Sequence, residues 1–128
     1  MITWKNMDTL ASYEALKATK PINLVEAMSG ESGAARVKKY TVPMGAGMDF
    51  NYGARPVDEE ILKALAAFAK EQQLTEKYAA LYNGEVINTG EKRRVLHQLT
   101  RGQLGNDVIA DGVNKREFYV GEQNKIAA

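Results

Sequence analysis

The first thirty residues show two short helical patterns. Apolar Leu10, Tyr13 and Leu16 are spaced three residues apart, which predicts a short helix capped by Asp8 or Thr9. Pro21 ends this pattern because it cannot continue a helix. Asn23 with Glu26 three residues later then predicts the start of a second short helix, and the glycines of segment 29–33 predict the turn that ends it.

The apolar period changes to two after residue 39. Tyr40, Val42 and Met44 alternate with polar residues or proline, and after Gly45-Ala46-Gly47 the alternation continues. The residues of the second run are Met48, Phe50 and Tyr52. Two such runs around a glycine-containing turn predict a β-hairpin with one buried face, and Pro43 places its strand at an edge.

The clearest helix follows Pro56. Asp58 is suited to cap it, and Glu59 and Glu60 suit its first turn. Its apolar stripe consists of Ile61, Leu62, Leu65, Phe68 and Ala69. Thr75 then predicts the start of another helix over residues 76–82. The first of these two helices has the pattern of an element that packs against a core.

Residues 81–101, LYNGEVINTGEKRRVLHQLTR, join two apparent helical patterns. Gly84 follows the apolar end of the first, where a left-handed residue commonly terminates a helix. Asn88 with Glu91 three positions later resembles a reciprocal helix cap, so a helix is predicted from Asn88 or Thr89. The apolar face of this predicted helix consists of Val95, Leu96 and Leu99.

The last part of the chain contains a short extended pattern and a helix. Segment 107–112 predicts an extended piece closed by a turn, and a helix is predicted from Val113 or Asn114. Its apolar members are Phe118, Tyr119, Val120 and Ile126. The helical register continues to Ala128 without a stop signal, which favours a piece of a longer polypeptide. The predicted fold class is α+β, mainly helical with one β-hairpin.

Composition excludes several classes of protein. The 128 residues are 45% hydrophobic and 26% charged, which is typical of one globular domain. No run of about 18 apolar residues predicts a membrane span. The balance of 17 basic against 16 acidic residues offers no general attraction to nucleic acid or anionic membranes. The absence of cysteine removes disulfides and thiolate metal sites, and it fits a cytoplasmic location.

The stretch 84–101 resembles the N-terminal part of glucose-6-phosphate isomerases. The matching residues, without a gap, are Gly84, Glu85, Ile87, Asn88, Glu91, Arg93, Val95, Leu96, His97 and Arg101. The chain departs from the family pattern at Gly90, Lys92, Arg94, Leu99 and Thr100. A weaker resemblance extends back to about Ala34, because the family also has a hairpin followed by a charged helix start.

The resemblance implies that residues 1–128 are an incomplete N-terminal segment of a larger α/β sugar-isomerase-type enzyme. That enzyme interconverts glucose 6-phosphate and fructose 6-phosphate through an enediol, without metal or organic cofactor, in the cytoplasm. It forms a homodimer. Its phosphate-binding and catalytic residues lie downstream, so no catalytic, substrate-binding or metal-binding residue is assigned here. The expected partners are the remainder of the polypeptide and, for the full-length enzyme, the sugar phosphate.

Motif residues with suggestive chemistry have structural interpretations. His97 is the only histidine and has no cysteine to join it, so a metal site is disfavoured and a hydrogen-bonded structural imidazole is predicted. The alternative for His97 is support of the neighbouring active site or dimer surface. Arg93 is expected to tie this segment to the missing body of the enzyme. The basic cluster around it, together with Arg101, has no interleaved aromatic residues and is interpreted as a solvated face. The alternative hypothesis is a self-contained helical binding module without catalytic activity.

Overall fold

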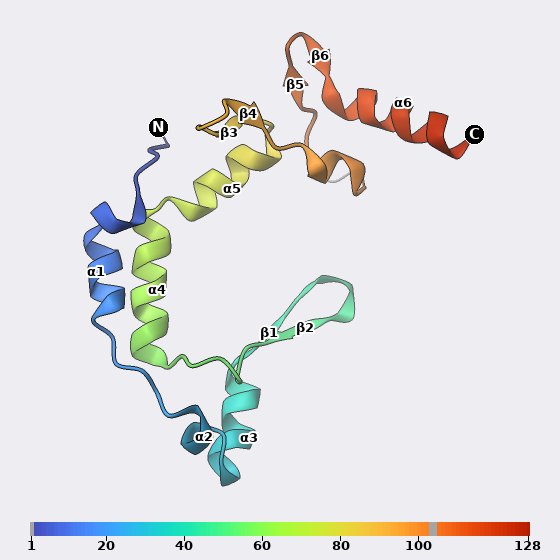
Figure 1. The fold of residues 1–128 in the computed structure, drawn as a ribbon. Coiled ribbons are helices and arrows are strands. Elements are labelled where there is room, and N and C mark those ends of the chain that lie inside the picture. Colours follow the sequence, from blue (N-terminus) through green and yellow to red (C-terminus); the bar gives the residue numbers. More distant parts are fainter. Residues whose placement is uncertain (1, 103–104) are drawn as a thin grey trace. The chain divides into compact units, whose positions relative to one another are not determined.

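The computed structural model describes residues 2–102 and 105–128. The chain forms two compact units, one of residues Lys5–Glu71 and one of Met1–Trp4 with Gln72–Ala128. Helices and short antiparallel hairpins make up both (Figure 1). The mixed α+β prediction is therefore confirmed. None of the helices in the described ranges is long and apolar enough to cross a bilayer.

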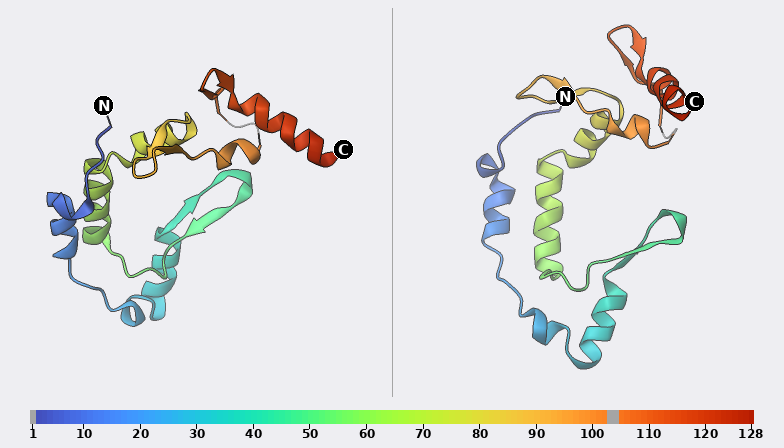
Figure 2. Two further views of the ribbon diagram at one scale, coloured as in Figure 1. Left: turned by 45° about the horizontal axis from the view of Figure 1, so that its top comes forward. Right: turned by 45° about the vertical axis from the view of Figure 1, so that its right-hand side comes forward.

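In the first unit, helix α1 (Ala11–Lys17) packs along helix α4 (Glu59–Glu71), and the two lie side by side in all views (Figures 1 and 2). The rings of Tyr13 and Phe68 meet at 5.8 Å between centroids. Capping of α1 by Asp8 or Thr9 was a wrong prediction. The Thr9 hydroxyl donates instead to the carbonyl of Asn6 at 2.8 Å, within a 3₁₀ turn over Met7–Thr9, and α1 begins only after buried Leu10.

Helix α2 (Leu24–Ala27) starts as predicted, because the Asn23 side chain accepts from the backbone N–H of Glu26 at 3.3 Å. The turn predicted over residues 29–33 is wrong. Helix α3 (Gly30–Lys39) begins there, with Gly30 at a φ of +57° and Gly33 buried. A β-carbon on Gly33 would overlap the carbonyl of Met28. The two glycines therefore let α3 start directly against the end of α2.

The predicted hairpin is confirmed. Strand β1 (Thr41–Pro43) pairs antiparallel with β2 (Asp49–Asn51), in the register Val42 opposite Phe50, around a 3₁₀ turn over Gly45–Gly47. The predicted burial of one hairpin face is confirmed at its base, where Tyr40 is 5% exposed, and is wrong toward the turn. The four apolar side chains of that face are between 46% and 58% exposed: Val42, Met44, Met48 and Phe50.

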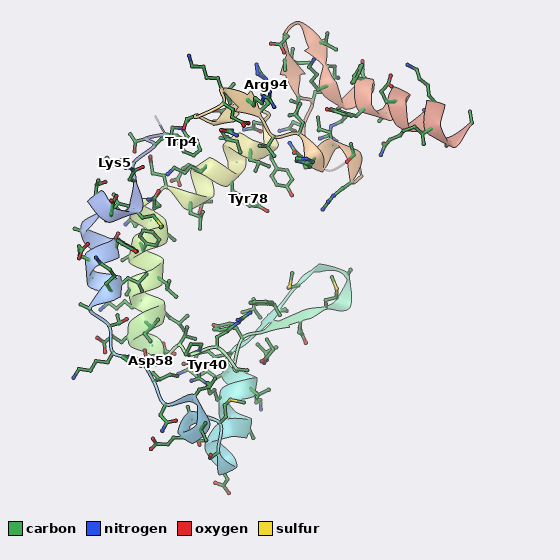
Figure 3. The ribbon with its side chains drawn as sticks, in the orientation of Figure 1. Trp4, Lys5, Tyr40, Asp58, Tyr78 and Arg94 are labelled. Atoms are coloured by element: carbon green, nitrogen blue, oxygen red, sulfur yellow. The ribbon has the colours of Figure 1, made fainter. Side chains whose placement is uncertain are left out.

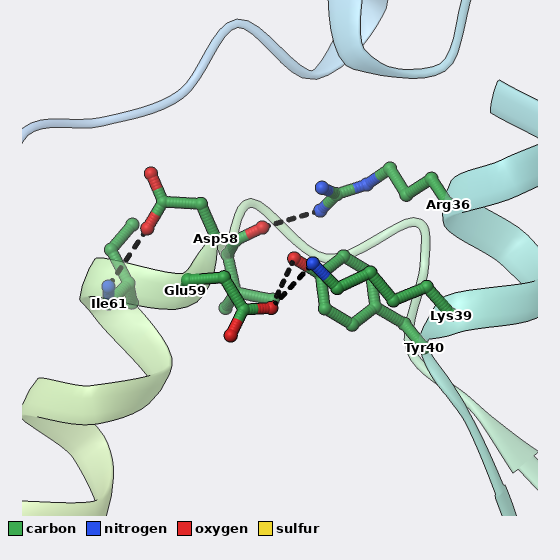
Figure 4. A network of polar contacts seen from close by, with 7 residues as sticks. Arg36, Lys39, Tyr40, Asp58, Glu59 and Ile61 are labelled. Carbon is green, nitrogen blue, oxygen red and sulfur yellow. Dashed lines mark hydrogen bonds and ion pairs between the residues drawn. The ribbon is translucent and has the colours of Figure 1, made fainter. Parts of the chain in front are cut away.

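Polar contacts join α3 to the start of α4 (Figure 4). Asp58 caps α4 as predicted, since its Oδ1 accepts from the backbone N–H of Ile61 at 2.9 Å. The Arg36 guanidinium donates to the carbonyls of Gly53, Arg55 and Val57 at 2.6 to 2.8 Å. One side chain of α3 thereby holds the whole connection from β2 to α4 in place.

An ion pair adds to this junction. Lys39 Nζ lies 2.8 Å from Glu59 Oε1, which also accepts from the Tyr40 hydroxyl at 3.5 Å. The hydrogen bond from Lys39 holds the pKa of the Glu59 carboxyl below its ordinary value, and the same bond raises the pKa of Lys39.

The second unit begins with helix α5 (Leu74–Tyr82). Thr75 does not cap it, because the helix starts one residue earlier, after Gln73 in the left-handed conformation with a φ of +53°. Strands β3 (Val86–Asn88) and β4 (Arg93–Arg94) form a hairpin, followed by a 3₁₀ turn over His97–Thr100. The helix predicted from Asn88 or Thr89 is therefore wrong.

The chain ends in a third hairpin and a helix. Strands β5 (Ile109–Ala110) and β6 (Val113–Asn114) pair around the turn that the sequence predicts. Helix α6 (Lys115–Ala127) begins where expected, with the Asn114 side chain accepting from the backbone N–H of Arg116 at 3.1 Å. The sequence predicted one hairpin, whereas the described residues form three, because β3–β4 and β5–β6 are too short to show a clear alternation.

Candidate functional site

Segment 84–101, which carries the family motif, begins at Gly84, where helix α5 is terminated. The backbone N–H of Glu85 donates to the carbonyl of Ala80 at 3.0 Å, and that of Gly84 donates to Leu81 at 3.1 Å. These two bonds, with Gly84 at a φ of +71°, form a Schellman motif. The predicted role of Gly84 in ending the helix is confirmed.

Gly84 is also required by packing. A β-carbon at this position would overlap Cγ1 of Val108, which is 1% exposed. The Leu96 side chain would lie 3.4 Å from the same β-carbon. Val108 and Leu99 are the largest fully buried side chains among the described residues. The turn after α5 is therefore closed against the small core of its unit.

Asn88 and Glu91 do form a reciprocal pair, but they close a hairpin. Asn88 Oδ1 accepts from the backbone N–H of Glu91 at 3.1 Å, and Asn88 Nδ2 donates to the Glu91 carboxylate at 3.2 Å. Lys92 follows in the left-handed conformation, with a φ of +53°, so the chain does not continue here as a right-handed helix. The local hydrogen bonds of a cap and of this turn are alike, so the sequence signature was misread as a helix start.

His97 opens the 3₁₀ turn and its side chain is exposed. It lines a shallow hollow of about 240 Å³ together with Tyr78, Tyr82, Gln98 and Arg101. Tyr78, seen in Figure 3, packs against Tyr82 with ring centroids 5.5 Å apart. In the part of the chain that the structure describes, the His97 imidazole makes no hydrogen bond, so the predicted hydrogen-bonded imidazole on a helix edge is not what this segment forms.

A second hollow lies on the basic side of the stretch. Its volume is about 440 Å³, and its charged lining consists of Lys92, Arg93, Arg94, Asp111 and Lys115. Arg94, labelled in Figure 3, approaches Asp111 at 3.7 Å. Lys92 and Arg93 are exposed in this chain. Long, exposed cations of this kind attract anions weakly and do not by themselves form a catalytic site.

Arg116 is the polar residue that sequence reasoning missed. It is 8% exposed at the start of α6, and its Nε and Nη2 donate to the carbonyl of Asn106 at 3.2 and 3.0 Å. It therefore ties the loop before β5 to the helix after β6. No periodicity marks this residue, because it lies among the charged residues that ordinarily face water at a helix start.

The motif residues of segment 84–101 have two roles. Gly84, Asn88 and Glu91 shape the backbone, whereas Glu85, Arg93, His97 and Arg101 are exposed on it. Among residues 2–102 and 105–128, no three His, Asp or Glu side chains converge as ligands for a metal ion. The arrangement is that of a folded connection which presents charged and aromatic side chains on its surface.

A family model described as phosphoglucose isomerase matches residues 51–126, which is more than half of the chain. The chain belongs to the phosphoglucose isomerase family. The resemblance seen over residues 84–101 is thereby confirmed, and the family match begins within β2.

Curated relatives extend the family likeness over nearly the whole chain. A glucose-6-phosphate isomerase of Treponema denticola is 52% identical over 96% of this chain and 24% of its own length. That of Treponema pallidum (strain Nichols) is 43% identical over 99% of this chain and 24% of its own length. One from Borreliella burgdorferi (strain B31) is 38% identical over 98% of this chain. The chain therefore spans about a quarter of the length of these family members.

Proposed function

We propose that this chain is the N-terminal segment of a glucose-6-phosphate isomerase, and that residues 1–128 supply scaffold rather than chemistry. The full-length enzyme interconverts glucose 6-phosphate and fructose 6-phosphate through an enediol. The observation that carries this proposal is the match of nearly the whole chain to enzymes of that name, of which it spans about a quarter.

The small core supports a scaffold role. Among the described residues only six apolar side chains are buried: Leu10, Tyr40, Ala80, Leu99, Val108 and Ala110. Phe118 and Ile126 of α6 are 50% and 87% exposed. Apolar surface of this kind is typical of a segment that packs against further protein. A self-contained binding module, the alternative hypothesis, would bury more of its apolar residues within itself.

The remaining features of the enzyme follow from the family resemblance. The phosphate-binding and catalytic regions lie downstream of residue 128, and the enzyme acts in glycolysis and gluconeogenesis in the cytoplasm, as a homodimer without cofactor. Arg93, His97 and Arg101 are exposed in the segment, and they contact the downstream part of the polypeptide. Gly84, Asn88 and Glu91 fix the local backbone from which these exposed side chains project.

A coupled assay tests the proposal. Fructose 6-phosphate is supplied to the full-length polypeptide and, separately, to the 128-residue chain, and glucose 6-phosphate is detected through NADPH formation by its dehydrogenase. Turnover is expected from the full-length polypeptide and none above the blank from the chain alone. Turnover by the chain alone would place the chemistry within residues 1–128. A full-length polypeptide that folds but does not isomerise fructose 6-phosphate would contradict the proposed enzyme function.

A further inference from the structure

The β1–β2 hairpin has one apolar and one polar face. Successive side chains on a strand point to opposite sides, and Val42 is directly opposite Phe50. Met44 and Met48 are the next pair on the same side, since the backbone N–H of Met44 donates to the carbonyl of Met48 at 2.7 Å. The other face consists of Thr41, Pro43, Asp49 and Asn51.

The base of the hairpin is fixed to α3. Asn51 Nδ2 donates to the carbonyl of Val37 at 2.7 Å and to the Thr41 hydroxyl at 2.6 Å. The Thr41 hydroxyl donates to the same Val37 carbonyl at 2.7 Å. These bonds use the polar face, so they set the direction of the hairpin without covering its apolar face.

Aromatic packing continues the apolar face into the unit. The ring of Phe50 stacks on Tyr52 at 6.0 Å between centroids, and Tyr52 packs on Tyr40 at 5.1 Å. Tyr40 is only 5% exposed, whereas Phe50 is 55% exposed. The apolar surface therefore starts at a buried aromatic residue and becomes open toward the turn. A two-stranded hairpin with an open apolar face is only marginally stable in water, so this face requires a cover.

We infer that the apolar face of the β1–β2 hairpin docks on the part of the same polypeptide that follows residue 128. This inference rests on the proposed function, in which about three quarters of the enzyme lies beyond the chain described here. That length provides ample apolar surface for a partner within the same molecule. The face carries no charged side chain, so the surface that receives it is apolar as well.

The size of the face favours an intramolecular partner over a second copy of the chain. Its four side chains expose on the order of 400 Å² together, whereas a stable interface between two proteins buries about 800 Å² on each partner. Docking within one polypeptide does not lose the translational and rotational freedom that association of two molecules loses. A patch of this size is therefore sufficient for docking within one polypeptide and too small to hold two copies together by itself.

Site-specific photo-crosslinking in the full-length polypeptide tests the inference. The substitution Phe50→p-benzoylphenylalanine puts a crosslinker of similar shape on the apolar face, and the same substitution at Asp49 puts it on the polar face of the same strand. After irradiation and proteolysis, mass spectrometry is expected to find residue 50 linked to peptides from beyond residue 128, at least tenfold more often than residue 49. The crosslinked protein should keep the mass of one chain.

Each other outcome overturns the inference. Links from residue 50 to a second copy, seen as a doubled mass, would make this face a subunit contact. Links only within residues 1–128 would mean that the chain covers its own hairpin, and equal yields at positions 49 and 50 would mean that the apolar face is not the docking surface. The isomerase assay on the same samples separates the two proposals: full activity with any of these three results contradicts the docking and leaves the proposed function standing.

Discussion

The hairpins β1–β2 and β5–β6 have the same antiparallel pairing, but only the second has apolar side chains that are fully buried beside it. In the first, the apolar side chains are about half exposed, although their alternation is the more regular. At the second, Val108 and Ala110 are 1% and 2% exposed, and Val108 rests on the bare backbone of Gly84, whereas Ile109 and Val113 are 67% and 44% exposed. Alternation decides which side chains share a face. Whether that face is buried depends on a partner, and for Val108 the partner is a glycine whose missing side chain makes room.

The largest loss of stability is expected from Gly84→Ala, which disturbs the packing of Val108 against Gly84. An alanine at a φ of +71° is strained by about 1 kcal/mol, and the overlap with Val108 adds about 2 kcal/mol. The free energy of unfolding of the full-length polypeptide, measured by urea denaturation, should therefore fall by about 3 kcal/mol. Gly112→Ala is the control, since Gly112 has a φ of +74° but nothing within 4 Å, and only the strain of about 1 kcal/mol is expected.

One result would show that packing at Gly84 is unimportant. If Gly84→Ala and Gly112→Ala destabilise the protein equally, backbone strain explains both. A double variant gives a second check, because Val108→Ala removes the methyl group that the new β-carbon would overlap. The combined loss should then be smaller than the sum of the two single losses by about 1 kcal/mol.

A valine-to-alanine substitution beside β5–β6 and another in β1–β2 test the comparison of the two hairpins directly. Val108→Ala removes fully buried methyl groups and should lower the free energy of unfolding of the 128-residue chain by about 2 kcal/mol. Val42→Ala removes the same atoms from a side chain that is 46% exposed, and it should cost less than about 1 kcal/mol. Chemical denaturation of the two variants measures both values. Equal losses would mean that the hairpin face is already covered within this chain.

The sequence predicted the elements whose signals are local. The caps Asn23 and Asp58, the stop at Gly84 and the β1–β2 hairpin each depend on a few neighbouring residues, and all four are present. The wrong predictions come from residue patterns that are compatible with two different local structures. Asn88 with Glu91 can cap a helix or close a turn, and the left-handed Lys92 decides for the turn.

The motif residues were located by resemblance, and their surroundings could not be predicted from the sequence. His97 is exposed at the start of a 3₁₀ turn, where the sequence predicted a helix. Arg116 is buried at a position where it donates to the carbonyl of Asn106, ten residues away. Helix α3 was missed because glycine at two positions resembles a loop, although at Gly33 the lack of a side chain is what allows the helix to pack. Each case depends on contacts between segments, which a pattern of single residues does not contain.

Loss of the side-chain cap at the start of α4, in the unit that contains the open β1–β2 hairpin, should have a smaller effect on stability. Asp58→Ala removes the side-chain acceptor at the start of α4 and should lower the free energy of unfolding by about 1 kcal/mol in thermal or urea unfolding. Glu60→Ala removes a charge from the same first helical turn without removing the cap. It should therefore cost clearly less. A loss from Glu60→Ala as large as that from Asp58→Ala would attribute the effect to charge near the helix start instead of to the cap.

The smallest effect is expected from the Lys39–Glu59 ion pair, because both side chains are more than half exposed. The lowered pKa of Glu59 contributes stability above its unfolded value of 4.5, and this is lost as the pH falls through the folded pKa. The raised pKa of Lys39 contributes stability below 10.5, which is lost as the pH rises through the folded value. Lys39→Met should therefore lower the unfolding midpoint slightly at pH 7, and the difference from the unmodified protein should vanish in acid below the folded pKa of Glu59. Lys38→Met is the control, since Lys38 is exposed on the same turn. If its midpoint changes with pH as that of Lys39→Met does, the effect arises from net charge, and the junction between α3 and α4 depends on the hydrogen bonds of Arg36 instead.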